Sequence, residues 1–340
     1  MTARVDLLNI GLILLSLVLA ISIPFELFLW AYAILGPLHY VTEINWLEKK
    51  NFFVRDKRMI WVLVLLSTIT VIPGLLNIFP YFSNGGGTAL HKIHYFLWTN
   101  VAVFLFVALA LAAAMVYTGK KGILLLVAAL AAGLGMLFKT NSLFLVVFGI
   151  FLASIIHVYL FTALFMLFGV LKKPGVVGYL SIVVLLLVPL YISDLDIDLS
   201  DYKPSEEAMG SIEAIGIGQL KLVMAYALGF LKHTEQYLQL SAVGVKVQIF
   251  IAFAYLYHYL NWFSKTTVIG WHKVISRKKL ILLIGIWGVS VGLYFYNYLL
   301  GFSVLLLLSL LHVLLEFPLN VVSAVGIGKS FIAKKEVTQR

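Results

Sequence analysis

Apolar stretches of about 20 residues recur along the whole of this 340-residue chain. Each stretch is long enough to cross the roughly 30 Å hydrocarbon layer of a membrane as one α-helix. Hydrophobic residues make up 62% of the chain and charged residues only 12%, whereas about a quarter of the residues in soluble domains are charged. We therefore predict an all-α fold, a polytopic transmembrane helical bundle, with residues 1–340 forming a single transmembrane domain.

Ten spans are expected from these stretches. They lie at about 5–23, 24–47, 59–79, 94–117, 122–138, 143–170, 175–193, 244–263, 280–299 and 301–322. The first stretch has no small-residue cleavage site after it and leads straight into the next, so we expect it to be retained as a span.

The placement of the basic residues predicts the orientation. With the N-terminus in the cytoplasm, 19 of the 25 lysines and arginines fall on the cytoplasmic side. This bias follows the positive-inside rule, so we expect both termini in the cytoplasm and a multi-pass protein of the inner (plasma) membrane. The net charge of +10 is then explained by topology and by contact with anionic membrane lipids, without a nucleic-acid partner.

The longest stretch between spans, about 194–243, carries eight acidic residues and is expected to be an exterior loop. Its segment DLDIDLSD, residues 194–201, lacks the glycine and the terminal glutamate of an EF-hand loop. A solvated acidic loop is therefore favoured over a calcium site. Residues 218–240 mix apolar and charged side chains, which predicts a helix lying on the membrane surface.

Four histidines fall inside predicted spans. They are His39, His157, His258 and His312. An ionisable side chain inside the hydrocarbon layer costs free energy, so each of these histidines is expected to have a structural or functional role. All four spans run in the same direction, and the histidines differ in depth by at most about 12 Å of helix rise. Helix tilt and side-chain reach can therefore bring the four rings into one layer.

Two of these histidines are followed by a glutamate four residues later, His39 by Glu43 and His312 by Glu316. This spacing places both side chains on one helix face. A histidine can then bind a metal through one ring nitrogen while the carboxylate accepts a hydrogen bond from the other, or the carboxylate can itself bind the metal. The alternative is that neutral histidine and protonated glutamate only hydrogen-bond to neighbouring helices. The repetition favours a metal.

The chain contains no cysteine, so any metal must be bound by histidine or a carboxylate. Imidazole ligands point to iron, copper or zinc, and the nearby carboxylates favour iron, as Fe2+. Bis-histidine haem is the rival, but four helices at one depth fit a compact ion better. The other histidines, His91, His94, His233 and His272, are expected at interfaces or in loops.

Four short motifs, taken in chain order, carry a resemblance to a known family. They are GPLHYVTEI at 36–44, SIIHVYLFTAL at 154–164, YLYHYLNWF at 255–263 and LLHVLLEFPLN at 310–320. The series resembles the beta-carotene 15,15'-dioxygenase (Brp/Blh) family of integral membrane proteins. The resemblance implies iron bound by His39, His157, His258 and His312, with Glu43 and Glu316 beside the ligands.

The chain also departs from the family pattern. It has glutamate where the family usually has aspartate, no acid after His157, and Trp262 where a second histidine often follows the third motif. These departures affect the expected substrate more than the expected metal.

We therefore expect a membrane-embedded non-haem iron oxygenase, an oxidoreductase of the dioxygenase type. Its partners would be dioxygen and a lipophilic alkene such as a carotenoid, which it would cleave to a retinal-like aldehyde, with Glu43 and Glu316 in catalytic roles. The competing hypothesis is a polytopic transporter, or a proton or metal relay, that uses the same histidine–glutamate pairs. Tightly retained iron would distinguish the two.

Overall fold

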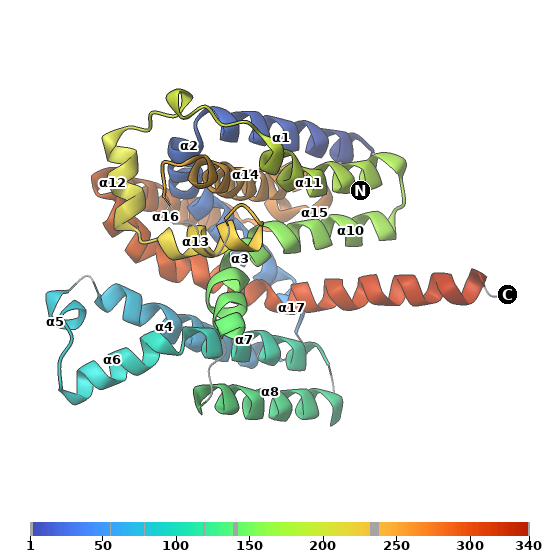
Figure 1. The fold of residues 1–340 in the computed structure, drawn as a ribbon. Coiled ribbons are helices and arrows are strands. Elements are labelled where there is room, and N and C mark those ends of the chain that lie inside the picture. Colours follow the sequence, from blue (N-terminus) through green and yellow to red (C-terminus); the bar gives the residue numbers. More distant parts are fainter. Residues whose placement is uncertain are drawn as a thin grey trace. The chain divides into compact units, whose positions relative to one another are not determined.

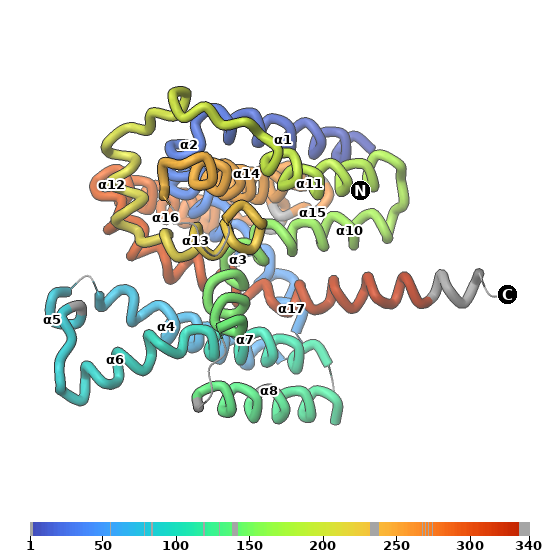
Figure 2. Tube along the Cα trace, in the orientation of Figure 1, coloured from blue at the N-terminus to red at the C-terminus, as the bar shows by residue number. Residues whose placement is uncertain are grey.

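The computed structural model describes residues 3–54, 56–77, 79–117, 120–138, 142–231 and 238–338. Figure 1 shows the helices as a ribbon, and Figure 2 traces the same chain as a tube. Within these residues all regular secondary structure is helical and there is no strand, which confirms the all-α class.

Among the described residues, nine helical stretches are long and apolar enough to cross a membrane. They are α1 (Ala3–Ser22), α2–η1–α3 (Pro24–Trp30, Ala31–Leu35, Gly36–Lys49), η3–α4 (Lys57–Met59, Ile60–Leu76), α8 (Lys120–Phe138), α9–η4–α10 (Ser142–Phe144, Leu145–Phe161, Thr162–Lys172), α11 (Val176–Asp194), α14 (Ala242–Ser264), α16 (Arg277–Tyr296) and α17 (Tyr298–Thr338). Among the described residues the number rises to eleven if each of two bent helix pairs counts as one span. These helices are compatible with a multi-pass membrane protein, while the orientation and the kind of membrane stay predictions.

The fourth expected span is bent. It consists of α6 (Ala89–Thr99) and α7 (Val101–Val116), whose axes differ by 57°. The break occurs at Asn100, whose backbone leaves the helical region and whose side-chain amide donates to the carbonyl of Phe96 at 2.7 Å. An asparagine side chain that bonds to nearby backbone competes with the regular helix pattern.

The acidic stretch at about 194–243 contains two helices, α12 (Glu206–Ala214) and α13 (Gly218–Ala227), bent by 88°. Gly216 lies between them with a φ of +70°, a conformation that glycine adopts without steric cost. The expected surface helix over 218–240 is therefore too long, because α13 ends at Ala227 and Gly229 again has positive φ. Residues 232–237 lie outside the described part.

The chain divides into two compact units. Unit 1 comprises residues 1–39, 158–301 and 330–340, and unit 2 comprises residues 40–157 and 302–329. The boundaries fall inside helices, between His39 and Tyr40 on α3, between His157 and Val158 on η4, and twice on α17. The expectation of a single membrane domain stays a prediction.

Helix α14 is the centre of unit 1. It packs against α1, α2, α11 and α13 (Figure 1). Almost every side chain from Gly244 to Trp262 is buried. A helix that is apolar on all sides is stable only when neighbours surround it. This arrangement places His258, near the end of α14, inside the unit.

Unit 2 is built around α7, which packs against α8 and α4, while α4 also contacts α6. Two short helices belong to the same unit, η2 (Asn51–Phe53) and α5 (Pro80–Ser83). The remaining short helices, η5 (Leu199–Asp201), α15 (Thr266–Ile269) and η6 (Trp271–Val274), belong to unit 1.

Candidate metal centre

His39 lies near the start of α3, the helix that directly follows the π-helical segment η1. Wider π-helical turns are rare and often occur at functional sites. Its ring is buried against His258, Tyr259 and Trp262, with centroid distances of 4.7, 5.3 and 5.6 Å. His39, which follows Gly36 and Pro37 at the start of α3, thus places its imidazole in the interior of unit 1.

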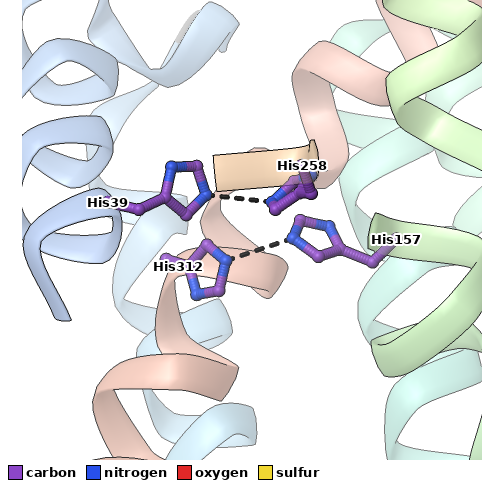
Figure 3. Close-up of side chains that lie close together, drawn as sticks. All are labelled: His39, His157, His258 and His312. Atoms are coloured by element: carbon purple, nitrogen blue, oxygen red, sulfur yellow. Dashed lines mark hydrogen bonds between the residues drawn. The ribbon is translucent and has the colours of Figure 1, made fainter. Parts of the chain in front are cut away.

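His258 faces His39 within unit 1, with 3.0 Å between the two Nε2 atoms (Figure 3). On its other side, Nδ1 lies 2.9 Å from Oγ1 of Thr162. The Thr162 hydroxyl donates to the carbonyl of Val158 at 2.9 Å. Because a carbonyl only accepts, the threonine proton is already committed and Nδ1 of His258 must be the donor. Its Nε2 therefore carries a lone pair.

His157 and His312 form the corresponding pair in unit 2. Their Nε2 atoms are 3.1 Å apart (Figure 3). His157 lies in the π-helical segment η4, and its Nδ1 is 3.0 Å from a carboxylate oxygen of Glu316. His312 lies on α17, and Tyr40 stacks on its ring with 4.2 Å between centroids. Both histidines are buried.

The two glutamates singled out in the sequence are buried in unit 2. Glu316 lies close to the side chain of Glu43 and beside His157. The contact with His157 connects two helices, α17 and η4, whereas the sequence spacing suggested a pairing along one helix. A carboxylate beside one ring nitrogen favours the lone pair on the other, which is the arrangement found at metal-bound histidines.

One ring nitrogen of each of the four histidines lies within 4.8 Å of those of the other three, so the group can hold a metal ion. Figure 3 shows the two pairs, His39 with His258 and His157 with His312. Among the described residues this is the one group of three or more histidines and carboxylates with such a spacing. The sequence therefore selected residues that come together, although their binding of metal stays a prediction.

The donor set fits a cation. Nε2 of His258 carries a lone pair, so its 3.0 Å approach to His39 requires either a proton on His39 or a positive ion that both nitrogens bind.

Thr162 was missed by the sequence reasoning. It stands in the motif SIIHVYLFTAL, five residues after His157, and is buried. A hydroxyl in an apolar helix usually bonds to its own backbone four residues earlier, and Thr162 does so. Its second role, as acceptor for His258, has no signal in the sequence because the two residues are 96 positions apart.

The remaining histidines have other surroundings. His91 bonds through its two ring nitrogens to Thr88 and to the carbonyl of Tyr81, each at 2.6 Å. His94 donates to the carbonyl of Pro73 at 3.0 Å. His272 is exposed on η6, and His233 lies outside the described residues. The two α6 histidines thus connect this helix to α5, through Tyr81, and to α4, through Pro73.

Comparison of the chain with protein-family models, with curated proteins and with solved structures finds no match. The resemblance in the four histidine motifs therefore stays a prediction, and the site has to be judged from its own geometry.

Proposed function

We propose that this chain is a membrane-embedded oxidoreductase in which His39, His157, His258 and His312 bind one non-haem iron ion, and that it oxidises a lipophilic alkene with dioxygen. The observation that supports it most directly is the state of His258. Its Nδ1 donates to Thr162, so its Nε2 lone pair is aimed at the other imidazoles. That lone pair is satisfied either by a proton on His39 or by a positive ion that both nitrogens bind, and the grouping of four histidines favours the ion.

The choice of iron follows from the donor types. Imidazole ligands suit iron, copper or zinc, and Glu316 beside His157 favours iron. Bound iron would supply the activation of dioxygen, a reaction that amino-acid side chains do not perform.

The chain's own residues would hold and shield that ion. Thr162 accepts a hydrogen bond from Nδ1 of His258, and a carboxylate oxygen of Glu316 lies 3.0 Å from Nδ1 of His157, so Nε2 of each ring is the nitrogen that would bind the metal. Tyr40, Tyr259 and Trp262 pack against the imidazoles and exclude water. A lipophilic alkene reaches such a buried site from the surrounding lipid, and a carotenoid is our first candidate.

The competing proposal is a proton relay or carrier. One observation favours it. In unit 2, three buried ionisable residues lie in a row, with Glu43 next to Glu316 and Glu316 beside His157. Such a chain of ionisable groups inside a membrane protein is typical of proton pathways. The relay needs no retained metal, so the metal content separates the two proposals.

The test is elemental analysis of the full chain purified in mild detergent. We expect one iron per chain, lost in His157→Ala and in His258→Ala and kept in the matched control His272→Ala, whose side chain is exposed. Protein that carries no metal in any preparation would contradict the iron proposal and favour the relay. Expression in a carotenoid-producing host tests the substrate, because loss of colour with appearance of an aldehyde is expected and unchanged colour would exclude carotenoids.

A further inference from the structure

Unit 2 contains a pocket of about 640 Å3 that none of the four candidate metal ligands lines. Its walls are the end of α4, the short helix α5, the turn that contains Gly85 and Gly86, and the first turns of α6 (Figure 1). All of the described residues that line it lie between Asn77 and Trp98. Ligand sites typically have volumes of about 300–1,000 Å3, so this pocket is large enough for one.

His91 is a structural part of the pocket wall. Its Nε2 donates to the carbonyl of Tyr81 and its Nδ1 bonds to the hydroxyl of Thr88, each at 2.6 Å. Gly86 packs so closely on this ring that an added Cβ atom would lie 2.7 Å from Cε1 of His91. The ring therefore joins α5, the turn and α6, and both of its nitrogens are already occupied.

His94 also lines the pocket, but one of its nitrogens is not occupied. The residue is only 8% exposed, and its Nε2 donates to the carbonyl of Pro73 at 3.0 Å. Its Nδ1 has no hydrogen-bond partner among the described residues, yet this atom is not sealed inside the protein. Because His94 is otherwise buried and lines the pocket, the pocket is where Nδ1 can meet a ligand.

The electrostatics of the pocket favour an anion. Lys92, whose side chain is exposed, is part of the lining, and no aspartate or glutamate is. Residues 57–193 contain no acidic residue at all, so Lys92 has no carboxylate nearby in the sequence. The first turns of α6 add the partial positive charge of a helix N-terminus. Negative groups are attracted to a pocket with this charge distribution.

The two polar side chains together favour a phosphate group over other anions. Lys92 supplies a positive charge, and Nδ1 of a neutral His94 can only accept a hydrogen bond. A phosphate monoester loses its second proton at about pH 6, so it can carry a negative charge and still donate through a P–OH group. If the imidazole is protonated, Nδ1 donates to a phosphate oxygen instead. A carboxylate at neutral pH has no proton to donate.

The rim of the pocket is aromatic. Tyr95 and Trp98 on α6 line it and are 69% and 52% exposed. The fourth expected span begins at about residue 94, and tyrosine and tryptophan are typical of the boundary between lipid and water. A lipid can therefore present its headgroup to this pocket while its acyl chains stay in the membrane.

We propose that this pocket binds a terminal phosphate group, with Lys92 and His94 as its polar contacts. Two sources share this chemistry, the headgroup of a membrane lipid of the phosphatidate type and free phosphate. The site does not use the proposed iron centre, because none of the four candidate metal ligands lines the pocket.

The test measures the equilibrium binding of labelled probes to the full chain in a neutral detergent, corrected with protein-free micelles. The lipid probes are dioleoyl phosphatidate and dioleoylglycerol, which has the same acyl chains and no phosphate. We expect a single saturable site for phosphatidate and roughly tenfold or weaker binding of dioleoylglycerol, since charge-assisted hydrogen bonds are lost. Treatment with a chelator should change neither affinity.

Inorganic phosphate, as a third labelled probe, distinguishes the two sources. Acyl chains add apolar contacts only if the natural ligand is a lipid. Phosphatidate that binds roughly tenfold or more tightly than inorganic phosphate would identify a lipid headgroup as the ligand. A smaller difference would identify free phosphate.

Two variants and one control identify the contacts. His94→Gln places an amide nitrogen near the position of Nε2, so it can still donate to Pro73, but it has no group in place of Nδ1. Lys92→Met removes the charge from an exposed side chain. Each change should weaken phosphatidate roughly fivefold. Lys50→Met, at an exposed lysine of unit 2 outside the pocket, should leave the affinity unchanged.

Equal affinities for phosphatidate and dioleoylglycerol would overturn the assignment of this pocket. The same loss in Lys92→Met and in Lys50→Met would also overturn it, because the attraction would then be a general effect of charge. Melting temperatures show whether the variants fold, and if His94→Gln melts lower, Lys92→Met decides the question by itself. None of these results bears on the iron proposal, which depends on metal content.

Discussion

His258 donates its Nδ1 proton to Thr162, whose own hydroxyl proton is committed to the carbonyl of Val158. The two hydrogen bonds, both 2.9 Å long, leave one tautomer for the imidazole and hold its ring plane in place. A neutral histidine whose Nε2 is free of a proton before any ligand arrives is prepared to bind a metal.

Replacement of Thr162 by valine is therefore expected to weaken metal binding without removing a ligand. Valine has nearly the shape of threonine but cannot accept a hydrogen bond from Nδ1 of His258. The His258 ring therefore loses the contact that fixes its tautomer. Loss of such a supporting contact typically lowers metal affinity roughly 10-fold to 100-fold. Iron affinity, measured by competition with a calibrated chelator, gives the comparison.

Thr162→Ser is the control for this experiment, because serine keeps the hydroxyl that accepts from His258. We expect it to restore most of the affinity that the valine variant loses. Valine and serine variants that bind iron equally well would show that Thr162 only packs against His258 and does not set its protonation.

A close approach of two backbones predicts the effect of a change at Gly301. A Cβ atom added there would lie 2.7 Å from the backbone nitrogen of Tyr294 and 2.8 Å from its Cα. Gly301→Ala must push α17 away from the end of α16, since backbone atoms cannot rotate aside as a side chain can. We expect a loss of about 1–3 kcal/mol in the free energy of unfolding, visible as a lower melting temperature in detergent.

Gly288→Ala is a matched control on α16. A Cβ atom at Gly288 meets nothing within 4 Å, and alanine is the better helix former. We expect an unchanged or slightly higher melting temperature. If both variants melted at the temperature of the original chain, the close packing at Gly301 would be refuted.

The pH dependence of stability should depend on Lys265, which follows the last residue of α14. Burial lowers the pKa of this lysine from 10.5 to about 8, although attraction to Asp6 opposes the shift. Between pH 8 and pH 10.5 the unfolded chain binds more protons at this lysine than the folded chain does. The free energy of unfolding therefore rises as the pH increases through this range. The slope from this one group is at most about 1.4 kcal/mol per pH unit.

Melting temperatures recorded in detergent between pH 8 and pH 10 check this expectation. Lys265→Met removes the titrating group and should flatten the rise. Lys273→Met, a change at an exposed lysine of η6, should retain it. A rise that persists in Lys265→Met would assign the pH dependence to other groups.

Much of the helical architecture could be predicted because hydrocarbon allows a backbone few choices. The largely apolar stretch at about 244–263 was expected to be a helix, and the structure forms α14 over Ala242–Ser264. The break at Asn100 could not be predicted in the same way. The apolar pattern continues through it, and only the local bond from Asn100 to Phe96 decides that the helix stops.

The candidate site was also predictable in part. The burial of His39 and His312 follows from their positions within apolar stretches, and the structure shows both rings enclosed. The partner of Glu316 did not follow from its spacing to His312, because its carboxylate lies next to His157, which η4 supplies. Such cross-helix contacts depend on packing between segments that are far apart in the sequence.

The amino-acid sequence by itself determined that this chain is helical, that its helices are apolar enough to cross a membrane, and which four histidines stand inside them. The physical reason is local, since backbone hydrogen bonds in an apolar medium can be satisfied within a single helix. Only the tertiary structure decided which ring nitrogens face one another within each histidine pair, that Thr162 accepts from Nδ1 of His258, and that Glu316 lies beside Nδ1 of His157. Those relationships are set by side chains from different helices, and no pattern along one helix contains them.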